Sequence, residues 1–200
     1  RPDERHAKFS DLEPLKNLLS KFENKEFNVE GYPSDFFVKK VIEVKPDQVT
    51  LVPDPPGALT SSFGWDCEIN KNLLTDIVSE FKKNDIRVSI FINPSIKTLE
   101  NLEVIQTDRV ELYTFDYAHT FNENKEKAIK DYIDVTNYLK KEFPKIELNA
   151  GHDLNLENLK FFLDKINNIK EVSIGHALIC DTFEFGLQET IKKYLTLTNN

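Results

Sequence analysis

Short runs of aliphatic and β-branched residues alternate along the chain with longer segments whose apolar residues recur every three or four positions. The short runs are typical of buried strands, and the longer segments are typical of amphipathic helices. A helix opens the chain, because Leu12, Leu15, Leu18 and Phe22 fall at helical intervals. Strands are then predicted at 26–31, 49–54, 87–92, 109–114, 146–151 and 171–176. Helices are predicted at 35–44, 70–83, 95–105, 126–143, 156–166 and 177–195.

Repetition of a strand followed by a helix predicts an α/β fold with a parallel sheet. Both an open doubly wound sheet and a closed TIM (β/α)8 barrel fit this pattern. A barrel needs eight strands, and this chain opens on a helix with no strand before it. We therefore expect residues 1–200 to form a single TIM-barrel domain without its N-terminal strand-helix-strand, which would add about 40 residues. The open sheet is the alternative.

Composition excludes several classes of function. Lys and Arg total 26 against 34 Asp and Glu, a formal charge of −8, which argues against a nucleic-acid-binding surface. The sequence contains neither an apolar run long enough to span a membrane nor a signal peptide at its start, so we expect a cytoplasmic protein. Cys67 and Cys180 lie far apart, and the sequence lacks a metal-binding HExxH motif and glycine-rich nucleotide loops, so neither a structural zinc nor a nucleotide-binding loop is indicated.

Candidate catalytic residues lie where the predicted strands end, which is the catalytic edge of α/β folds. Glu30 ends the first strand and is a candidate acid or base, although a carboxylate there could equally cap the next helix. Two other strands end in Gly-His, at Gly151-His152 and Gly175-His176. Histidine titrates near neutral pH, and glycine lets backbone N–H groups approach a phosphate. A single histidine at such a place is more often structural, but the repetition favours a site.

Three other places carry weaker signals. Arg1 and His6 flank a charged segment in which Arg1 could bind an oxyanion, although a solvated charge run is the simpler interpretation. Thr60 lies in the long connection 53–67, which is either a lid over a ligand or a static loop. Glu111 lies inside a strand, so it either faces the catalytic end of the barrel or holds a structural cation.

Several segments together resemble the family of pyridoxine 5′-phosphate synthases, and their order and spacing match over essentially the whole chain. They are RPDERH at 1–6, FNVEG at 27–31, LVPD at 51–54, NAGHDL at 149–154 and SIGHA at 173–177. The resemblance implies a TIM barrel that condenses 1-deoxy-D-xylulose 5-phosphate with 3-amino-2-oxopropyl phosphate. It also implies an enzyme without metal or organic cofactor that assembles as a cytoplasmic homo-octamer.

The resemblance also implies roles for individual residues. Glu30 matches the family's proton acceptor, and His152 matches its proton donor. Arg1, His6 and Thr60 match positions that hold the deoxyxylulose phosphate, while Asp153, Gly175 and His176 match positions that hold the aminoketone phosphate.

The chain departs from the family pattern in three respects. A further catalytic histidine of the family would lie two residues before Arg1, and an Asn-rich substrate motif and an arginine would also precede it. Asp153 stands where many members carry glycine, and the segment 115–118 replaces a Gly-Pro-Tyr-Ala type of loop. Two alternatives stay open: another phosphosugar lyase or isomerase on the same barrel, and a non-catalytic binder that keeps the phosphate sites.

Overall fold

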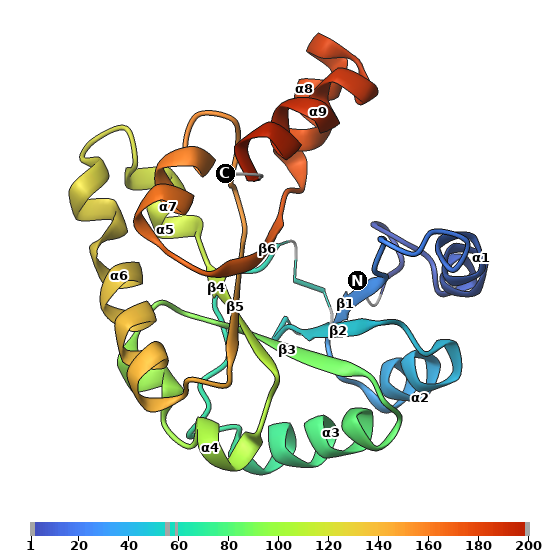
Figure 1. Ribbon diagram of the computed structural model, residues 1–200. Coiled ribbons are helices and arrows are strands. Elements are labelled where there is room, and N and C mark those ends of the chain that lie inside the picture. The colour runs from blue at the N-terminus through green and yellow to red at the C-terminus, as the bar shows by residue number, and fades with distance from the viewer. Residues whose placement is uncertain (1–2, 55–56, 59, 199–200) are drawn as a thin grey trace. The chain divides into compact units, whose positions relative to one another are not determined.

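The computed structural model describes residues 3–54, 57–58 and 60–198, and it shows strands and helices alternating along the chain (Figure 1). The strands are β1 Asn28–Gly31, β2 Gln48–Leu51, β3 Arg87–Ile92, β4 Arg109–Tyr113, β5 Glu147–Gly151 and β6 Ile169–Ser173. The α-helices are α1 Phe9–Leu19, α2 Asp35–Val44, α3 Lys71–Lys83, α4 Leu102–Ile105, α5 Phe115–Thr120, α6 Lys125–Glu142, α7 Leu159–Lys165, α8 His176–Phe185 and α9 Leu187–Thr198, with a 3-10 turn, η1, at Ile96–Leu99.

The strands follow one another in the sheet in chain order, from β1 to β6. The pairs β1–β2, β2–β3 and β5–β6 are parallel. Strands joined by helical crossovers must pair in this way, because each helix returns the chain to the same end of the sheet. The predicted α/β class and parallel pairing are therefore confirmed, whereas the additional N-terminal strand-helix-strand stays a prediction.

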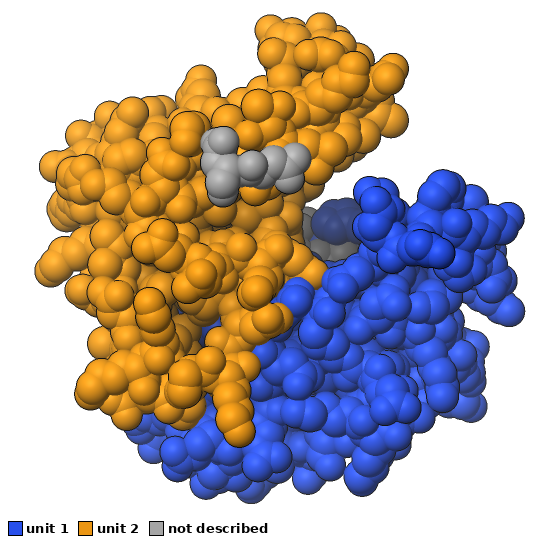
Figure 2. All heavy atoms as spheres, in the orientation of Figure 1, with its two compact units in different colours: residues 1–93, 97–111 blue, residues 94–96, 112–200 orange. Residues whose placement is uncertain are grey.

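The chain divides into two compact units, coloured separately in Figure 2. Unit 1 comprises Arg1–Asn93 and Lys97–Glu111, and unit 2 comprises Pro94–Ile96 and Leu112–Asn200. The boundary falls inside β4. Each unit is described below by itself.

In unit 1, the strands separate apolar from polar side chains by simple alternation. Val49, Leu51, Val88 and Ile90 are fully buried and, since successive side chains point to opposite faces, share one face. Helix α3 packs against β3 and places Leu74, Val78 and Phe81 in the same core. Burial of these side chains is the main stabilising contribution in this unit.

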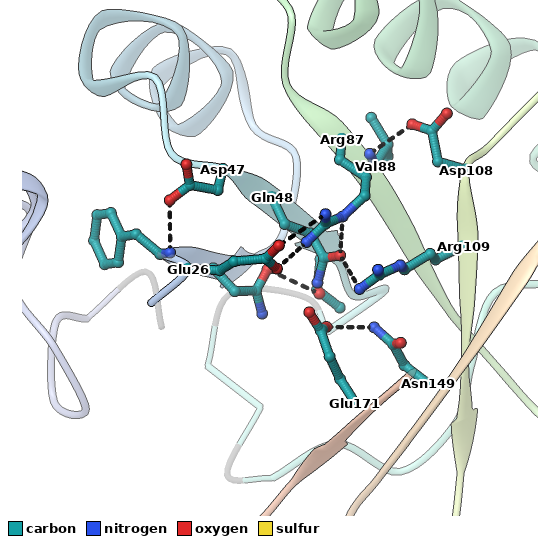
Figure 3. Close-up of polar contacts among 12 residues, drawn as sticks. Glu26, Asp47, Gln48, Arg87, Val88, Asp108, Arg109, Asn149 and Glu171 are labelled. Atoms are coloured by element: carbon teal, nitrogen blue, oxygen red, sulfur yellow. Dashed lines mark hydrogen bonds and ion pairs between the residues drawn. The ribbon is translucent and has the colours of Figure 1, made fainter. Parts of the chain in front are cut away.

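The opposite face of these strands is polar, as Figure 3 shows. The register places Gln48 of β2 beside Arg87 of β3, and the Gln48 Oε1 accepts hydrogen bonds from Arg87 at 2.7 Å and from Arg109 at 3.1 Å. Arg87 also pairs with Glu26. Gln48 is completely buried and Arg109 is 8% exposed, so these bonds offset the cost of removing the polar groups from water.

Unit 2 is built around a cluster of buried aromatic rings. Tyr117 of α5 lies edge-to-face with Phe162 of α7 at 5.0 Å and with Tyr132 of α6 at 5.9 Å between ring centroids. Both tyrosine hydroxyls donate to buried carbonyls, Tyr117 to Asn158 at 2.6 Å and Tyr132 to Tyr113 at 2.8 Å. The cluster thereby fixes the end of β4 and the loop after β5, where the candidate site lies.

Several predicted elements differ from the observed ones. The strand predicted at 49–54 ends at Leu51, and the helix predicted at 156–166 begins at Leu159. The helix predicted at 95–105 is broken into η1 and α4, because Asn101 between them has a left-handed backbone with φ of 66°. The helix predicted at 177–195 is two helices separated by Gly186, whose φ is 79°. The last strand ends at Ser173 rather than at 176, so His176 begins α8 instead of ending a strand.

Candidate active site

In unit 1, Glu30 lies one residue from the end of β1, as predicted. A cavity of about 470 Å³ adjoins it, lined by residues of α1, β1 and α2. The chain turns sharply after this strand. A Cβ on Gly31 would come 2.3 Å from the Phe37 ring, so only glycine allows α2 to pack this close to the strand end. Ser34 caps α2 by accepting a hydrogen bond from the Phe37 N–H at 3.2 Å.

The other predicted residues of unit 1 lie on two connected segments. Arg1 lies outside the described residues, while His6 and Thr60 are both exposed. The Arg5 guanidinium donates to the carbonyl of Ala58, which ties the segment that carries His6 to the loop that carries Thr60. The structure thus brings these two segments together within one unit.

The loop that carries Thr60 is anchored at its far end by Gly64 and Trp65. The Trp65 N–H donates to the Phe91 carbonyl at 2.7 Å, and its indole N–H donates to the Leu51 carbonyl at 2.9 Å. Gly64 lies so close to β3 that a Cβ there would approach the Ile92 backbone to 2.3 Å. Trp65 is 4% exposed, so it fixes this part of the loop.

His152 follows β5 directly and lies in unit 2. Its φ is 97°, a backbone conformation that only glycine adopts without strain, and such strain is found mostly at functional sites. Thr114 holds the loop in place, because its hydroxyl donates to the His152 carbonyl and its N–H donates to the Gly151 carbonyl at 2.9 Å. The imidazole contacts Tyr113 edge-on, with ring centroids 4.9 Å apart.

Asp153 comes next and also has a left-handed backbone, with φ of 56°. Its Oδ2 lies 3.3 Å from Nδ1 of His152 and 3.7 Å from Nδ1 of His119 on α5. Asp153 and His119 line a cavity of about 320 Å³ with Ala118, Asn155 and Ala177. The cavity therefore brings α5, the loop after β5 and the first turn of α8 together.

Gly175 and His176 lie where α8 begins, and both are exposed. Gly175 occupies the N-cap position, and its carbonyl accepts a hydrogen bond from the Leu178 N–H at 3.1 Å, so the N–H groups of His176 and Ala177 are the ones without a partner within the helix. A helix start of this kind favours an anion through its N–H groups and its dipole.

Glu111 is 2% exposed in β4, on the polar face of unit 1. No cluster of three or more His, Cys, Asp or Glu side chains with metal-binding geometry occurs among the described residues. None of the described helices combines the length and apolar character needed to cross a membrane.

Sequence reasoning missed two features of this site. The segment 115–118 is expected to be a loop, but it belongs to α5 together with His119, and the Phe115 and His119 rings stack with centroids 3.8 Å apart. Their spacing of four residues was the available signal, but the short segment lacked enough apolar periodicity to predict a helix. The polar face formed by Gln48, Arg87 and Arg109 was also not predicted. Each strand by itself is dominated by apolar residues, so its sequence does not show that polar residues of neighbouring strands meet.

Comparison with known proteins identifies the family of this chain. The family model described as "Pyridoxal phosphate biosynthesis protein PdxJ" matches residues 1–200. A pyridoxine 5′-phosphate synthase of Parabacteroides distasonis is 47% identical over 200 residues, which is 100% of this chain and 82% of the relative. One of Cytophaga hutchinsonii is 48% identical over 195 residues, which is 98% of this chain and 79% of the relative.

Solved structures with little sequence similarity share the fold. A 3-keto-L-gulonate-6-phosphate decarboxylase of Vibrio cholerae superposes with a TM-score of 0.60 at 10% identity, covering 94% of this chain and 78% of its own. A 4-hydroxy-2-oxoglutarate aldolase gives 0.59 at 13% identity, covering 95% of this chain and 76% of its own. These neighbours support a TIM-barrel-like fold. The family model matches all 200 residues, and two relatives are 47% and 48% identical. The chain therefore belongs to the pyridoxal phosphate biosynthesis protein PdxJ family.

Proposed function

We propose that the protein is a pyridoxine 5′-phosphate synthase, which condenses 1-deoxy-D-xylulose 5-phosphate with 3-amino-2-oxopropyl phosphate in vitamin B6 biosynthesis. The observation that carries this proposal is the match of all 200 residues to the family, with relatives of that name at 47–48% identity. The products would be pyridoxine 5′-phosphate, inorganic phosphate and water.

In this proposal Glu30 accepts protons and His152 donates them. Closing the pyridine ring requires imine formation, dehydration and a new carbon–carbon bond, and each of these steps moves a proton to or from carbon or oxygen. Both side chains lie at the carboxyl ends of parallel strands, the edge at which TIM-barrel enzymes hold their catalytic residues. No metal or organic cofactor takes part.

Two phosphorylated substrates need two anion sites. Arg1, His6 and Thr60 would hold the deoxyxylulose phosphate, with the Thr60 loop excluding water from reactive intermediates. Gly175, His176 and the backbone N–H of Asp153 would hold the aminoketone phosphate. The start of α8 supports the second assignment, since a ten-residue helix directs its first N–H groups and its positive dipole end toward a bound anion.

The proposal also includes assembly as a homo-octamer in the cytoplasm. An apolar surface on α8 and α9 supports self-association: Phe183 is 88% exposed, and Ile179 and Leu187 are more than half exposed. Exposed apolar side chains gathered in this way are typical of protein interfaces. Light scattering after gel filtration would measure the mass of the assembly, and a monomeric mass would contradict this part.

The proposed function is tested with Glu30→Gln and His152→Asn, made in the polypeptide as the organism produces it. Each variant is expected to lose at least about a hundredfold in kcat while binding both phosphorylated substrates, because a general acid or base contributes about 10²–10⁴ to the rate. Asp164→Asn is the control, since Asp164 is an exposed residue of α7 that forms an ion pair with the exposed Lys160. Binding of both substrates by the unaltered protein without turnover would instead establish the non-catalytic binder.

A further inference from the structure

Asp54 carries a buried carboxylate that the proposed mechanism does not use. It lies shortly after β2, at the carboxyl end of the strand, and it is 3% exposed. Removing a carboxylate from water is costly unless hydrogen-bond donors replace the water. The hydroxyl of Ser61, a residue that is also buried, donates to the Asp54 Oδ2 at 2.5 Å. This is the length of a charge-assisted hydrogen bond, which is stronger than a bond between neutral groups.

The chain that leads to Asp54 is fixed by the sheet. The Val52 N–H donates to the Gly31 carbonyl at 3.1 Å, which continues the pairing of β1 with β2 beyond the end of both strands. Pro53 follows and is buried, and its ring fixes its own φ angle. The Asp54 carboxylate therefore extends from a rigid part of the chain and can hold another segment in place.

The segment held in this way includes Thr60. Ser61 directly follows Thr60, and since neighbouring Cα atoms are about 3.8 Å apart, a fixed Ser61 restricts the place of the Thr60 hydroxyl. A second attachment lies on the other side of Thr60, where the Ala58 carbonyl accepts from the Arg5 guanidinium. Thr60 thus lies between two held residues, and Arg5 directly precedes His6.

We propose that Asp54 and Ser61 are positioning residues, whose hydrogen bond holds Thr60 where its hydroxyl binds the deoxyxylulose phosphate. The inference rests on the proposed function, in which Thr60 is a ligand of that phosphate. The Asp54 carboxylate acts through Ser61 and not on the phosphate itself, because two negative groups repel each other. A Thr60 that is ordered before the substrate arrives loses less entropy on binding, so the affinity for this substrate depends on the bond.

The test compares Ser61→Ala with Ser62→Ala, both made in the polypeptide as the organism produces it. Ser61→Ala removes the hydroxyl that donates to Asp54, whereas Ser62 is the adjacent residue and is exposed, so Ser62→Ala is a matched control. In Ser61→Ala, both KM and Kd for 1-deoxy-D-xylulose 5-phosphate should rise about tenfold, which corresponds to about 1.4 kcal/mol.

The other kinetic parameters separate positioning from a general loss of structure. In Ser61→Ala, kcat and the KM for 3-amino-2-oxopropyl phosphate should stay within about twofold of the unaltered protein, because only binding of the first substrate is weakened. Ser62→Ala should leave all of these values within about twofold, as surface substitutions usually do. A lower Tm of Ser61→Ala without any rise in KM or Kd would make the bond purely structural and would overturn the proposal.

A double variant tests whether Asp54 and Ser61 act through one bond. Asp54→Ala removes the acceptor, so adding Ser61→Ala to it should raise the KM for 1-deoxy-D-xylulose 5-phosphate no further, and effects that multiply would contradict the proposal. Ser61→Ala decides the question by itself if Asp54→Ala does not fold. Binding without turnover by the unaltered protein would defeat the proposed function, while the Kd of Ser61→Ala would still test the bond, so the two failures are distinguishable.

Discussion

Replacing Gly64 by alanine tests how the loop that carries Thr60 is attached to unit 1. An alanine Cβ at this position would lie 2.3 Å from the Ile92 carbonyl carbon, 2.4 Å from the Ile92 Cα and 2.4 Å from the Asn93 nitrogen. All three are backbone atoms at the end of β3, a buried strand paired with β2. A side chain could rotate away from the new methyl group, but this backbone cannot move without breaking the strand.

The loop must therefore lift from the strand. The contacts at risk are the Gly64 N–H to the Asn93 side chain at 2.9 Å and the Trp65 N–H to the Phe91 carbonyl at 2.7 Å. Overpacking a well-packed interior costs about 1–3 kcal/mol, and the loss of these hydrogen bonds places this site at the upper end, about 3 kcal/mol. For a chain of this size, 1 kcal/mol corresponds to about 2–4 °C, so Tm should fall by about 6–12 °C.

Thermal unfolding followed by circular dichroism measures this change. Ser62→Ala is the matched control, since Ser62 lies in the same loop, is exposed, and gains no atom on substitution. It should unfold within about 2 °C of the unaltered protein, as surface substitutions usually do. A Gly64→Ala protein that unfolds together with Ser62→Ala would refute the close approach of the loop to β3.

Two further predictions concern charge and thiol chemistry. Burial alone would raise the pKa of the Asp47 carboxyl, but hydrogen bonds from the Phe27 N–H at 2.7 Å and from Lys16 at 3.1 Å outweigh it, and the pKa is lowered from its ordinary 3.8. Asp47→Asn should therefore have a lower free energy of unfolding than the unaltered protein above about pH 4, and this difference should shrink as the pH falls through the lowered pKa. Urea unfolding at pH 7 and at pH 3 measures the difference. A difference of the same size at both pH values would contradict the prediction. Burial raises the pKa of the Cys67 thiol to about 12, whereas Cys180 is exposed. A thiol reagent at pH 8 should therefore label Cys180 alone, as peptide mass spectrometry would show. Rapid labelling of both thiols would contradict the burial of Cys67.

Much of the fold could be predicted from single segments. β3 and α2 occupy the predicted residues, because each combines a strong apolar pattern with a clear turn signal at its ends. The helix breaks at Asn101 and Gly186 could not be predicted from the apolar pattern, since a single residue with a left-handed backbone leaves the periodicity on both sides intact. Helix α5 was missed because six residues are too few to show a helical period.

Some residues of the candidate site could likewise be predicted from single segments, and others could not. Glu30 and His152 were predicted because strand ends are visible in sequence and carry the chemistry in α/β folds. The nearness of His119 to Asp153, with 3.7 Å between Nδ1 and Oδ2, was not predicted, because 34 residues and two intervening elements separate them, and only the folded unit brings α5 beside the loop after β5. Contacts of this kind depend on packing between elements, which the periodicity of one segment does not encode.

The central claim is tested most directly by mixing the purified protein, as the organism produces it, with 1-deoxy-D-xylulose 5-phosphate and 3-amino-2-oxopropyl phosphate. Pyridoxine 5′-phosphate, identified by mass and absorbance, should form together with inorganic phosphate in equal amounts, and Glu30→Gln should abolish both. Absence of the product under conditions in which both substrates bind, or undiminished formation by Glu30→Gln, would contradict the account.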